Sequence, residues 1–270
     1  MSESKIEKIT CPCGTVFEWE HTTSDEGFSA SFIESYRPTL CNICQDARDE
    51  ARDIERARLQ AVEDEEKLTA AIEQTSANLD NRTPARFRTT AIAHSGFNLE
   101  LWNRVKLWRP TADVPWLGLI GESGTCKTRI AYLLLREIVL GSIMPSDRRY
   151  LAFEIATAYE LSEAVRNQYS KRMPDVRSCW DDRTCGEVSR DRLDRMATTG
   201  ILLLDDFGKA KHTPAVAAEL FAIVDHRHEE NLPMIWTANS QPDALVGDMT
   251  ADMAGPLCGR LIECSAIITV

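Results

Sequence analysis

Apolar and polar positions follow two different rhythms through the second half of the chain. Compact apolar runs predict buried strands at residues 114–120, 149–155, 201–204, 233–239 and 266–270. Between these runs, apolar residues at helical spacing predict helices at residues 129–139, 158–169 and 213–230. Strands that alternate with helices in this way are typical of an α/β fold built around a parallel sheet.

The first hundred residues have a different pattern. A charge-dense segment at residues 46–72 contains neither glycine nor proline, and acid–base pairs such as Asp49–Arg52 favour a solvated helix. Its apolar residues recur at a sparse spacing of about seven residues, so we expect a spacer helix, with a partner-binding coiled coil as the alternative. The polar residues 78–88 that follow predict a hinge and a domain boundary.

Composition narrows the class of protein. At 270 residues with 43% apolar content, the chain is long enough for one large domain and one small one. It contains no run of about 18 apolar residues, so we expect no membrane span. The N-terminus lacks an apolar signal region, which predicts a cytoplasmic protein. The formal net charge of −11 disfavours a surface that coats nucleic acid everywhere, although a local basic groove stays open.

A basic stretch with interleaved acids begins after residue 170. We interpret it first as a solvated face, and the alternative is an edge that faces nucleic acid. Its basic residues are Lys171, Arg172, Arg177, Arg183, Arg190, Arg192 and Arg195.

Two close cysteine pairs lie near the N-terminus. The chain has nine cysteines, an odd number, and a reducing compartment keeps thiols free, so metal ligation or burial is favoured over a disulfide framework. Four thiolates suit a tetrahedral Zn²⁺ ion, and His21 could replace one of them. The alternative is a set of unrelated free thiols. The predicted zinc ligands are Cys11, Cys13, Cys41 and Cys44.

A glycine loop between a predicted strand and a predicted helix has the sequence Gly121-Glu122-Ser123-Gly124-Thr125-Cys126-Lys127-Thr128. That order is typical of a phosphate cradle, in which backbone N–H groups of the loop and helix start bind phosphate oxygens. Lys127 would reach the β- and γ-phosphates, and Thr128 would offer its hydroxyl to Mg²⁺. Glycine usually precedes this lysine, and here Cys126 brings a Cβ to the tight bend. A structural glycine turn with a chance Lys-Thr is the alternative.

A second motif ends the apolar run at residues 201–204. Asp205 and Asp206 follow it directly, which predicts a buried parallel strand that delivers two carboxylates at its C-terminal end, where ligands bind in open α/β sheets. Asp205 would orient Mg²⁺ through water, and Asp206 would activate the attacking water. Asn239 ends the next predicted strand and could position that water or contact the γ-phosphate.

Taken together, residues 115–270 resemble the core of an AAA+ ATPase. They are similar in particular to replicative-helicase loaders of the DnaC type and to transposition-helper ATPases of the IstB type. The first hundred residues share only the presence of a cysteine-pair module with some loaders. The resemblance rests on Gly121–Thr128, Leu202–Asp206, the helix at 220–227, Thr237-Ala238-Asn239 and Gly259-Arg260-Leu261.

The resemblance implies a role for each site residue. Lys127 and Thr128 would hold ATP and Mg²⁺, the acidic strand end would serve catalysis, and Asn239 would be the first sensor. Arg260 would be an arginine finger that reaches the γ-phosphate of a neighbouring subunit, with Arg227 as the competing candidate.

We therefore expect a P-loop NTPase fold with a central parallel sheet flanked by helices, as an AAA+ core without a lid. The predicted domains are a zinc-binding module at 1–45, a charged linker helix and hinge at 46–88, and the ATPase at 89–270. The expected function is an ATP-hydrolysing helicase loader in DNA replication, which would bind a replicative helicase and single-stranded DNA and form a homo-oligomer through shared ATP sites. A transposition helper and a nucleotide-binding adaptor with little hydrolysis are the alternatives.

Overall fold

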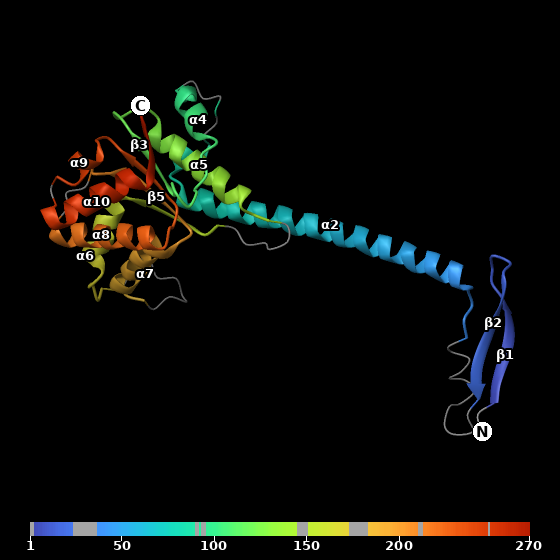
Figure 1. The fold of residues 1–270 in the computed structure, drawn as a ribbon. Helices are drawn as coiled ribbons and strands as arrows, with labels where there is room; N and C mark the ends of the chain where they lie inside the picture. Colours follow the sequence, from blue (N-terminus) through green and yellow to red (C-terminus); the bar gives the residue numbers. More distant parts are fainter. Residues whose placement is uncertain are drawn as a thin grey trace. The chain divides into compact units, whose positions relative to one another are not determined.

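The protein divides into two compact units, Met1–Lys67 and Leu68–Val270, and the division falls within one long helix, α2 (Asn42–Arg82) (Figure 1). We describe each unit by itself. The computed structural model describes residues 3–23, 37–89, 92, 96–144, 151–172, 183–209, 213–247 and 249–270.

The first unit contains a two-stranded antiparallel sheet. Strand β1 (Glu3–Thr10) pairs with β2 (Val16–Thr23), and the register closes at Thr10 opposite Val16. In the turn between them, the Cys11 N–H donates to the Thr15 carbonyl at 2.8 Å and Gly14 has a φ of 91°, a conformation that glycine adopts without steric cost. This turn presents the first cysteine pair, and the second pair lies at the start of α2.

Helix α2 is longer than the sequence predicts. It begins at Asn42 rather than at residue 46 and continues to Arg82, so residues 78–82 of the predicted hinge at 78–88 are helical. Tertiary packing explains the extension, because Thr75 and Leu79 are buried in the second unit. Pro84, which cannot continue the hydrogen-bond pattern, follows the helix end, and a short helix α3 (Ala85–Arg88) comes next.

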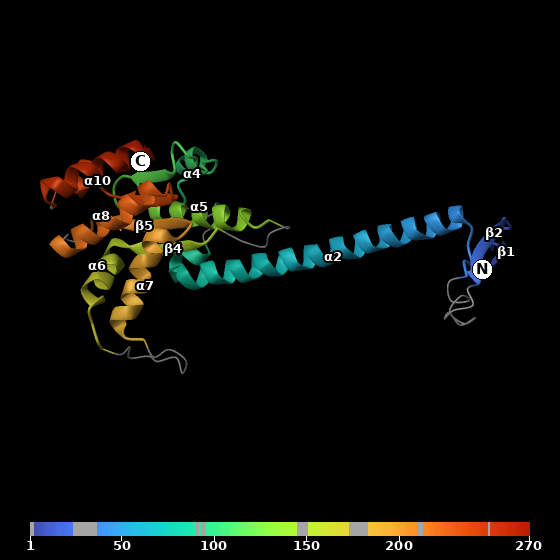
Figure 2. The same ribbon diagram turned by 60° about the horizontal axis from the view of Figure 1, so that its bottom comes forward.

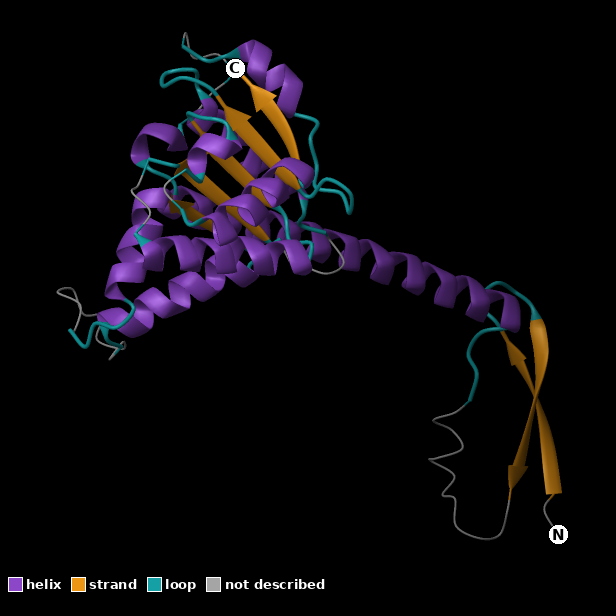
Figure 3. Ribbon diagram, turned by 60° about the vertical axis from the view of Figure 1, so that its left-hand side comes forward, coloured by secondary structure: helices purple, strands orange, loops and turns teal. Residues whose placement is uncertain are grey.

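The second unit is built on a five-stranded parallel sheet (Figure 3). The strand order is β4-β5-β6-β3-β7, so the strand that leads into the glycine loop, β3, lies between β6 and β7. All five predicted strands are present, which confirms the central parallel sheet. The strands are β3 (Trp116–Ile120), β4 (Phe153–Thr157), β5 (Ile201–Phe207), β6 (Met234–Ala238) and β7 (Ser265–Thr269).

Helices cover both faces of this sheet (Figure 2). Helices α4 (Leu99–Val105) and α5 (Lys127–Gly141) pack on one face together with the C-terminal end of α2. The other face is covered by α6 (Ala158–Asn167), α7 (Cys185–Thr198), α8 (Pro214–Glu229), α9 (Pro242–Leu245) and α10 (Ala251–Glu263). No helix of the described residues has the length and apolarity that a bilayer crossing requires.

Strand residues alternate between the two faces. Trp116 and Ile120 of β3 pack with one apolar cluster, and Leu117 and Leu119 pack with the other. Gly118 faces the indole of Trp236 so closely that a Cβ there would lie 2.3 Å from the ring. The sheet is thus buried on both faces, which explains why its strands are continuous apolar runs in the sequence.

Candidate nucleotide-binding site and cysteine cluster

The glycine loop connects the end of β3 to the first residue of α5, as the sequence predicts. Gly124 has a φ of 90° and Cys126 a φ of 70°, so the loop passes twice through the left-handed region. Cys126 occupies the position before α5 where glycine is usual, and its thiol donates to the Gly96 carbonyl at 2.8 Å. The loop therefore keeps its bend at the cost of backbone strain, because left-handed conformations are unfavourable for residues with a Cβ.

Lys127 extends into the loop and is only 6% exposed. Its Nζ donates to the Gly121 carbonyl and to the Glu122 carbonyl, both at 2.7 Å. Burial lowers the pKa of Lys127, and the negative charge of Asp206 opposes that shift. The ammonium group thus occupies the concavity of the loop, where phosphate oxygens could replace the carbonyls as its partners.

Thr128 lies against the acidic end of β5. Its Oγ1 donates to Asp205 Oδ1 at 2.8 Å, and Thr237 Oγ1 of β6 donates to the same oxygen at 2.6 Å. Asp205 is 4% exposed, and burial raises its pKa while the two hydroxyl groups oppose the rise. A hydroxyl and a carboxylate in direct contact are the ligand types that Mg²⁺ prefers, so this pair fits a Mg²⁺ ion bound with phosphates.

Asp206 lines the cavity at the glycine loop, and Asp205 contacts Thr128, which lines it as well, although neighbouring residues in a regular strand point to opposite faces. The β5–β6 register shifts between Leu204 and Phe207, and Asp206 has a φ of 57°. Its carboxylate forms an ion pair of 2.7 Å with Lys209. This irregularity accompanies the position of Asp206 at the cavity, next to Asp205 and its contact with Thr128.

Asn239, directly after β6, completes the predicted set. Its Nδ2 donates to Ser123 Oγ at 3.3 Å, which joins the end of β6 to the glycine loop. The loop, Asp206 and Asn239 line one cavity of about 280 Å³. The structure thus brings together the predicted residues of the phosphate loop, the two acids and the asparagine.

The same cavity has lining residues that the sequence analysis did not select. Arg86 and Phe87 of α3 and Arg129 of α5 contribute to it. The Phe87 ring stacks on Tyr132 with centroids 5.2 Å apart, and the Arg129 guanidinium lies 5.5 Å from the Phe87 centroid. Arg86 and Phe87 precede the loop in the segment predicted as a hinge, where only the local pattern Arg-Phe-Arg at 86–88 could have indicated them. Arg129 follows the loop, in the helix predicted at residues 129–139.

The two tryptophans before the sheet belong to the core. Trp102 is 4% exposed and contacts Phe97 edge-to-face, and Trp108 packs against the same apolar cluster as α5. Both tryptophans therefore serve core packing, and neither lines the cavity at the glycine loop.

Arg227 has a structural environment that excludes a role as a finger. It is fully buried, and its guanidinium donates to the carbonyls of Met196 at 3.0 Å, Thr199 at 2.9 Å and Pro233. Burial lowers the pKa of Arg227 to about 9. The side chain holds α7, α8 and the start of β6 together and cannot reach another subunit. The alternative assignment of Arg227 as the arginine finger is therefore wrong.

Arg260 lies on α10 and is 22% exposed. Its guanidinium pairs with Asp225 of α8 and lies 4.9 Å from the ring centroid of Phe221, also of α8. Within this chain Arg260 therefore joins α10 to α8, which lie side by side (Figures 1 and 2). A role in trans would require this ion pair to open, and the finger assignment stays a prediction.

The four N-terminal cysteines converge. Their sulfur atoms all lie within 4.8 Å of one another, and Cys13 Sγ is 3.7 Å from Cys41 Sγ. Four sulfurs placed about 2.3 Å from one zinc ion would be separated by about 3.8 Å, so the thiol set fits tetrahedral Zn²⁺. Cys11 and Cys41 are buried, whereas Cys13 is exposed. His21 lies in β2, and its side chain is outside the described residues.

Fold and site together define an α/β protein with a P-loop fold, in which the glycine loop lies between a strand of a parallel sheet and the helix that follows it. The parallel sheet places the glycine loop, the acidic end of β5 and the polar end of β6 at one edge, which is where open α/β sheets bind ligands.

Comparisons with known proteins give structural neighbours only. No protein-family model matches the sequence, and no curated protein matches it. Solved structures with a similar fold include DnaI, at 17% sequence identity over 71% of this chain and 96% of that chain, with a TM-score of 0.47. They also include the DnaC helicase loader, at 15% sequence identity over 72% of this chain and 98% of that chain, with a TM-score of 0.47. DnaA from Aquifex aeolicus bound to AMPPCP is similar at 16% identity over 67% of this chain, with a TM-score of 0.45, and the match spans about half of that protein, 48%.

Proposed function

We propose that this protein binds ATP with Mg²⁺ and hydrolyses it. The observation that carries the proposal is the contact between Thr128 and Asp205 directly beside the buried Lys127. The residues come from two distant parts of the chain, and their meeting at a glycine loop supports a triphosphate site over a chance Lys-Thr.

Each residue has a distinct task in this reaction. Backbone N–H groups of the loop and Lys127 bind the phosphates, and Thr128 with Asp205 provides oxygen ligands on the metal side. A bound Mg²⁺ would neutralise charge on the phosphate oxygens. Asp206 orients and deprotonates the attacking water, and Asn239 holds that water or a γ-phosphate oxygen. Since Asp206 pairs with Lys209, the ion pair must loosen before the carboxylate accepts a proton.

An ATPase assay with the Lys127→Ala variant tests the enzyme claim. We expect turnover to fall at least about a hundredfold, because the variant loses a charged donor to the reacting phosphate. Lys171→Ala is the matched control, since Lys171 is exposed and lies outside the cavity. Equal turnover in the two variants would remove the assignment.

The biological setting that we propose is loading of a replicative helicase in DNA replication. The motif order of residues 115–270 supports this choice, and the cysteine module with α2 offers a separate unit for binding a helicase. The ATPase core would contact single-stranded DNA and assemble as a homo-oligomer through shared ATP sites, with zinc in the cysteine cluster. Capture of a helicase rather than a transposase by the full chain separates this function from that of a transposition helper.

A nucleotide-binding adaptor with little hydrolysis is the second candidate. Cys126 favours it because it is strained and replaces the usual glycine. Asp206 favours it because aspartate is one methylene shorter than the glutamate that is commoner at this position in the proteins that the chain resembles. Nucleotide binding that matches an active P-loop protein, together with negligible turnover in the presence of Mg²⁺, would support the adaptor.

A further inference from the structure

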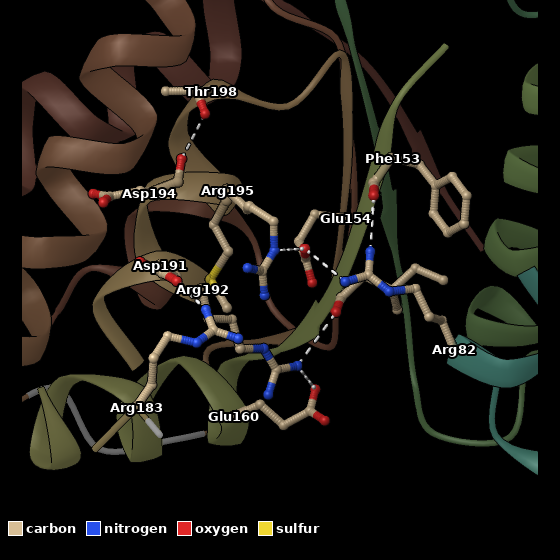
Figure 4. Close-up of polar contacts among 12 residues, drawn as sticks. Arg82, Phe153, Glu154, Glu160, Arg183, Asp191, Arg192, Asp194, Arg195 and Thr198 are labelled. Atoms are coloured by element: carbon tan, nitrogen blue, oxygen red, sulfur yellow. Dashed lines mark hydrogen bonds and ion pairs between the residues drawn. The ribbon is translucent and has the colours of Figure 1, made fainter. Parts of the chain in front are cut away.

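A second cavity, of about 420 Å³, lies between the end of α2, the edge strand β4 and helix α7. Three arginines line it, Arg82 from α2 and Arg192 and Arg195 from α7 (Figure 4). No residue is shared between its lining and that of the nucleotide cavity. It is therefore a separate site whose chemistry the proposed ATPase does not use.

Two of these arginines share a single carboxylate. Glu154 of β4 is 2% exposed, and its Oε2 lies 3.0 Å from Arg82 Nη2 and 2.9 Å from Arg195 Nε (Figure 4). Arg82 Nη1 also donates to the Phe153 carbonyl at 2.9 Å. The buried glutamate holds the two guanidinium groups in place and neutralises only one of their two charges.

The third arginine has a similar anchor. Arg192 Nη2 lies 3.3 Å from Glu160 Oε2, and that oxygen already accepts the Thr157 N–H at 2.8 Å. Three arginines and two glutamates thus leave one positive charge in excess at the cavity.

Donor groups on two arginines are left unused. Among the residues that the structure describes, Arg195 Nη1 and Nη2 have no hydrogen-bond partner, and the same holds for Arg192 Nε and Nη1. The two arginines lie one helical turn apart on α7, so their free N–H groups border the same cavity. Planar guanidinium groups with paired donors match the oxygens of a phosphate group better than any neutral ligand.

We propose that this cavity binds a phosphate group, carried either by a soluble nucleotide or by the backbone of single-stranded nucleic acid. Its volume lies in the range typical of small-ligand sites, and its anchors are already fixed by Glu154 and Glu160. Tyr132 lines this cavity and stacks on Phe87, which lines the nucleotide cavity. A single aromatic pair therefore connects the two sites.

The experiment measures phosphate binding in the full chain carrying Lys127→Ala, which removes the main phosphate contact of the P-loop. Three probes are titrated by calorimetry: inorganic phosphate, AMP, and an oligothymidylate without terminal phosphates. We expect at least one probe to bind, and the tighter of AMP and oligothymidylate identifies the source of the phosphate. Absence of binding by all three overturns the proposal, and that result would leave the ATPase assignment untouched.

Substitution then assigns the binding to this cavity. Arg192→Gln in the Lys127→Ala background should lower the affinity for the tightest-binding probe about tenfold or more, because a charge-assisted contact is lost. Arg190→Gln is the matched control on the same helix, since Arg190 is exposed and donates to the Gln168 carbonyl outside the cavity. Arg195→Lys, which keeps the charge beside Glu154 and removes the forked donors, should also weaken binding. Equal affinity in all these variants places the bound phosphate elsewhere and overturns the site.

Discussion

Thr128 donates a hydrogen bond of 2.8 Å to Asp205, a residue 77 positions further along the chain. The accepting oxygen also receives the Thr237 hydroxyl at 2.6 Å, so α5, β5 and β6 meet at one atom. The carboxylate is thereby oriented by two hydroxyl groups before any metal binds. Such pre-orientation lowers the cost of forming a metal site, because the ligands need not reorganise.

Asp205→Asn is predicted to stabilise the free protein and to abolish Mg²⁺-dependent hydrolysis. Burial raises the pKa of Asp205, so folding favours the protonated carboxyl, and the stability that this preference provides is lost as pH rises through the folded pKa. The neutral amide avoids burying a charge and keeps an oxygen for both hydroxyl donors. Thermal unfolding should show a higher Tm for Asp205→Asn than for the natural protein at neutral pH. The difference in Tm should be smaller at about pH 4, where carboxyls begin to protonate.

Asp206→Asn serves as the control for that measurement. The Asp206 side chain is 33% exposed and is paired with Lys209. Removing its charge therefore does not remove a cost of burying that charge. A Tm gain of equal size in both variants would contradict the explanation based on the burial of Asp205.

Cys126→Gly is predicted to raise nucleotide affinity severalfold. Cys126 adopts a left-handed conformation, which costs an L-residue roughly 1–2 kcal/mol and which glycine adopts freely. Relief of this strain favours the closed loop, and removal of the Cβ gives phosphate oxygens more room. Equilibrium titration with an ATP analogue measures the effect. Cys126→Ala keeps the Cβ and loses the thiol contact to Gly96, so it should bind no better than the natural protein.

Chains with Arg260→Ala and chains with Lys127→Ala are predicted to complement each other when they are mixed. If Arg260 acts on a neighbour's nucleotide, Arg260→Ala should lose turnover and keep nucleotide binding. A mixture of Arg260→Ala and Lys127→Ala chains should then regain part of the activity, since some sites combine an intact Lys127 with an intact Arg260.

Asp225→Asn separates this role from the contact within the chain. The variant weakens the ion pair that joins α10 to α8 and leaves the guanidinium present, so activity should persist. Failure of the mixture to regain turnover, with both chains folded, would assign Arg260 to helix packing alone.

The cysteine cluster is predicted to hold about one zinc ion per chain. Cys41→Ser should lose the metal, because it removes a buried thiolate from a four-ligand set. Metal analysis of the purified protein measures the stoichiometry, and proteolysis after chelation should cleave within residues 1–67 while the second unit stays intact. Cys258→Ser, which changes a thiol of α10 far along the chain, should retain the zinc content.

Sequence patterns predicted the sheet, the glycine loop and the acidic strand end because each is a local signal. Five apolar runs became five strands, and Lys127, Asp205 and Asn239 met at one edge as parallel topology requires. Helices α7 and α10 were not predicted. The first is rich in charged residues, and the second contains Gly255, Pro256 and Gly259, which normally interrupt helices.

What the sequence could not reveal depends on contacts between distant segments. The end of α2 is helical because Leu79 packs into the apolar core of the second unit, to which it belongs. Helix α3 contributes Phe87 to the cavity at the glycine loop although it has no phosphate-binding motif. Likewise, the burial of Arg227 among backbone carbonyls follows only from the way that α7 and α8 meet.

The left-handed backbone at Asp206 restricts which amino acids can follow Asp205. Aspartate and asparagine enter that region far more readily than side chains with longer stems do, since their short polar groups bond locally. A glutamate at this place would have to bear the same φ of 57° or straighten the bulge and turn away from the loop. The shorter acid is therefore the one that this turn accommodates, and a variant of this chain with glutamate at position 206 should also show a regular end to β5.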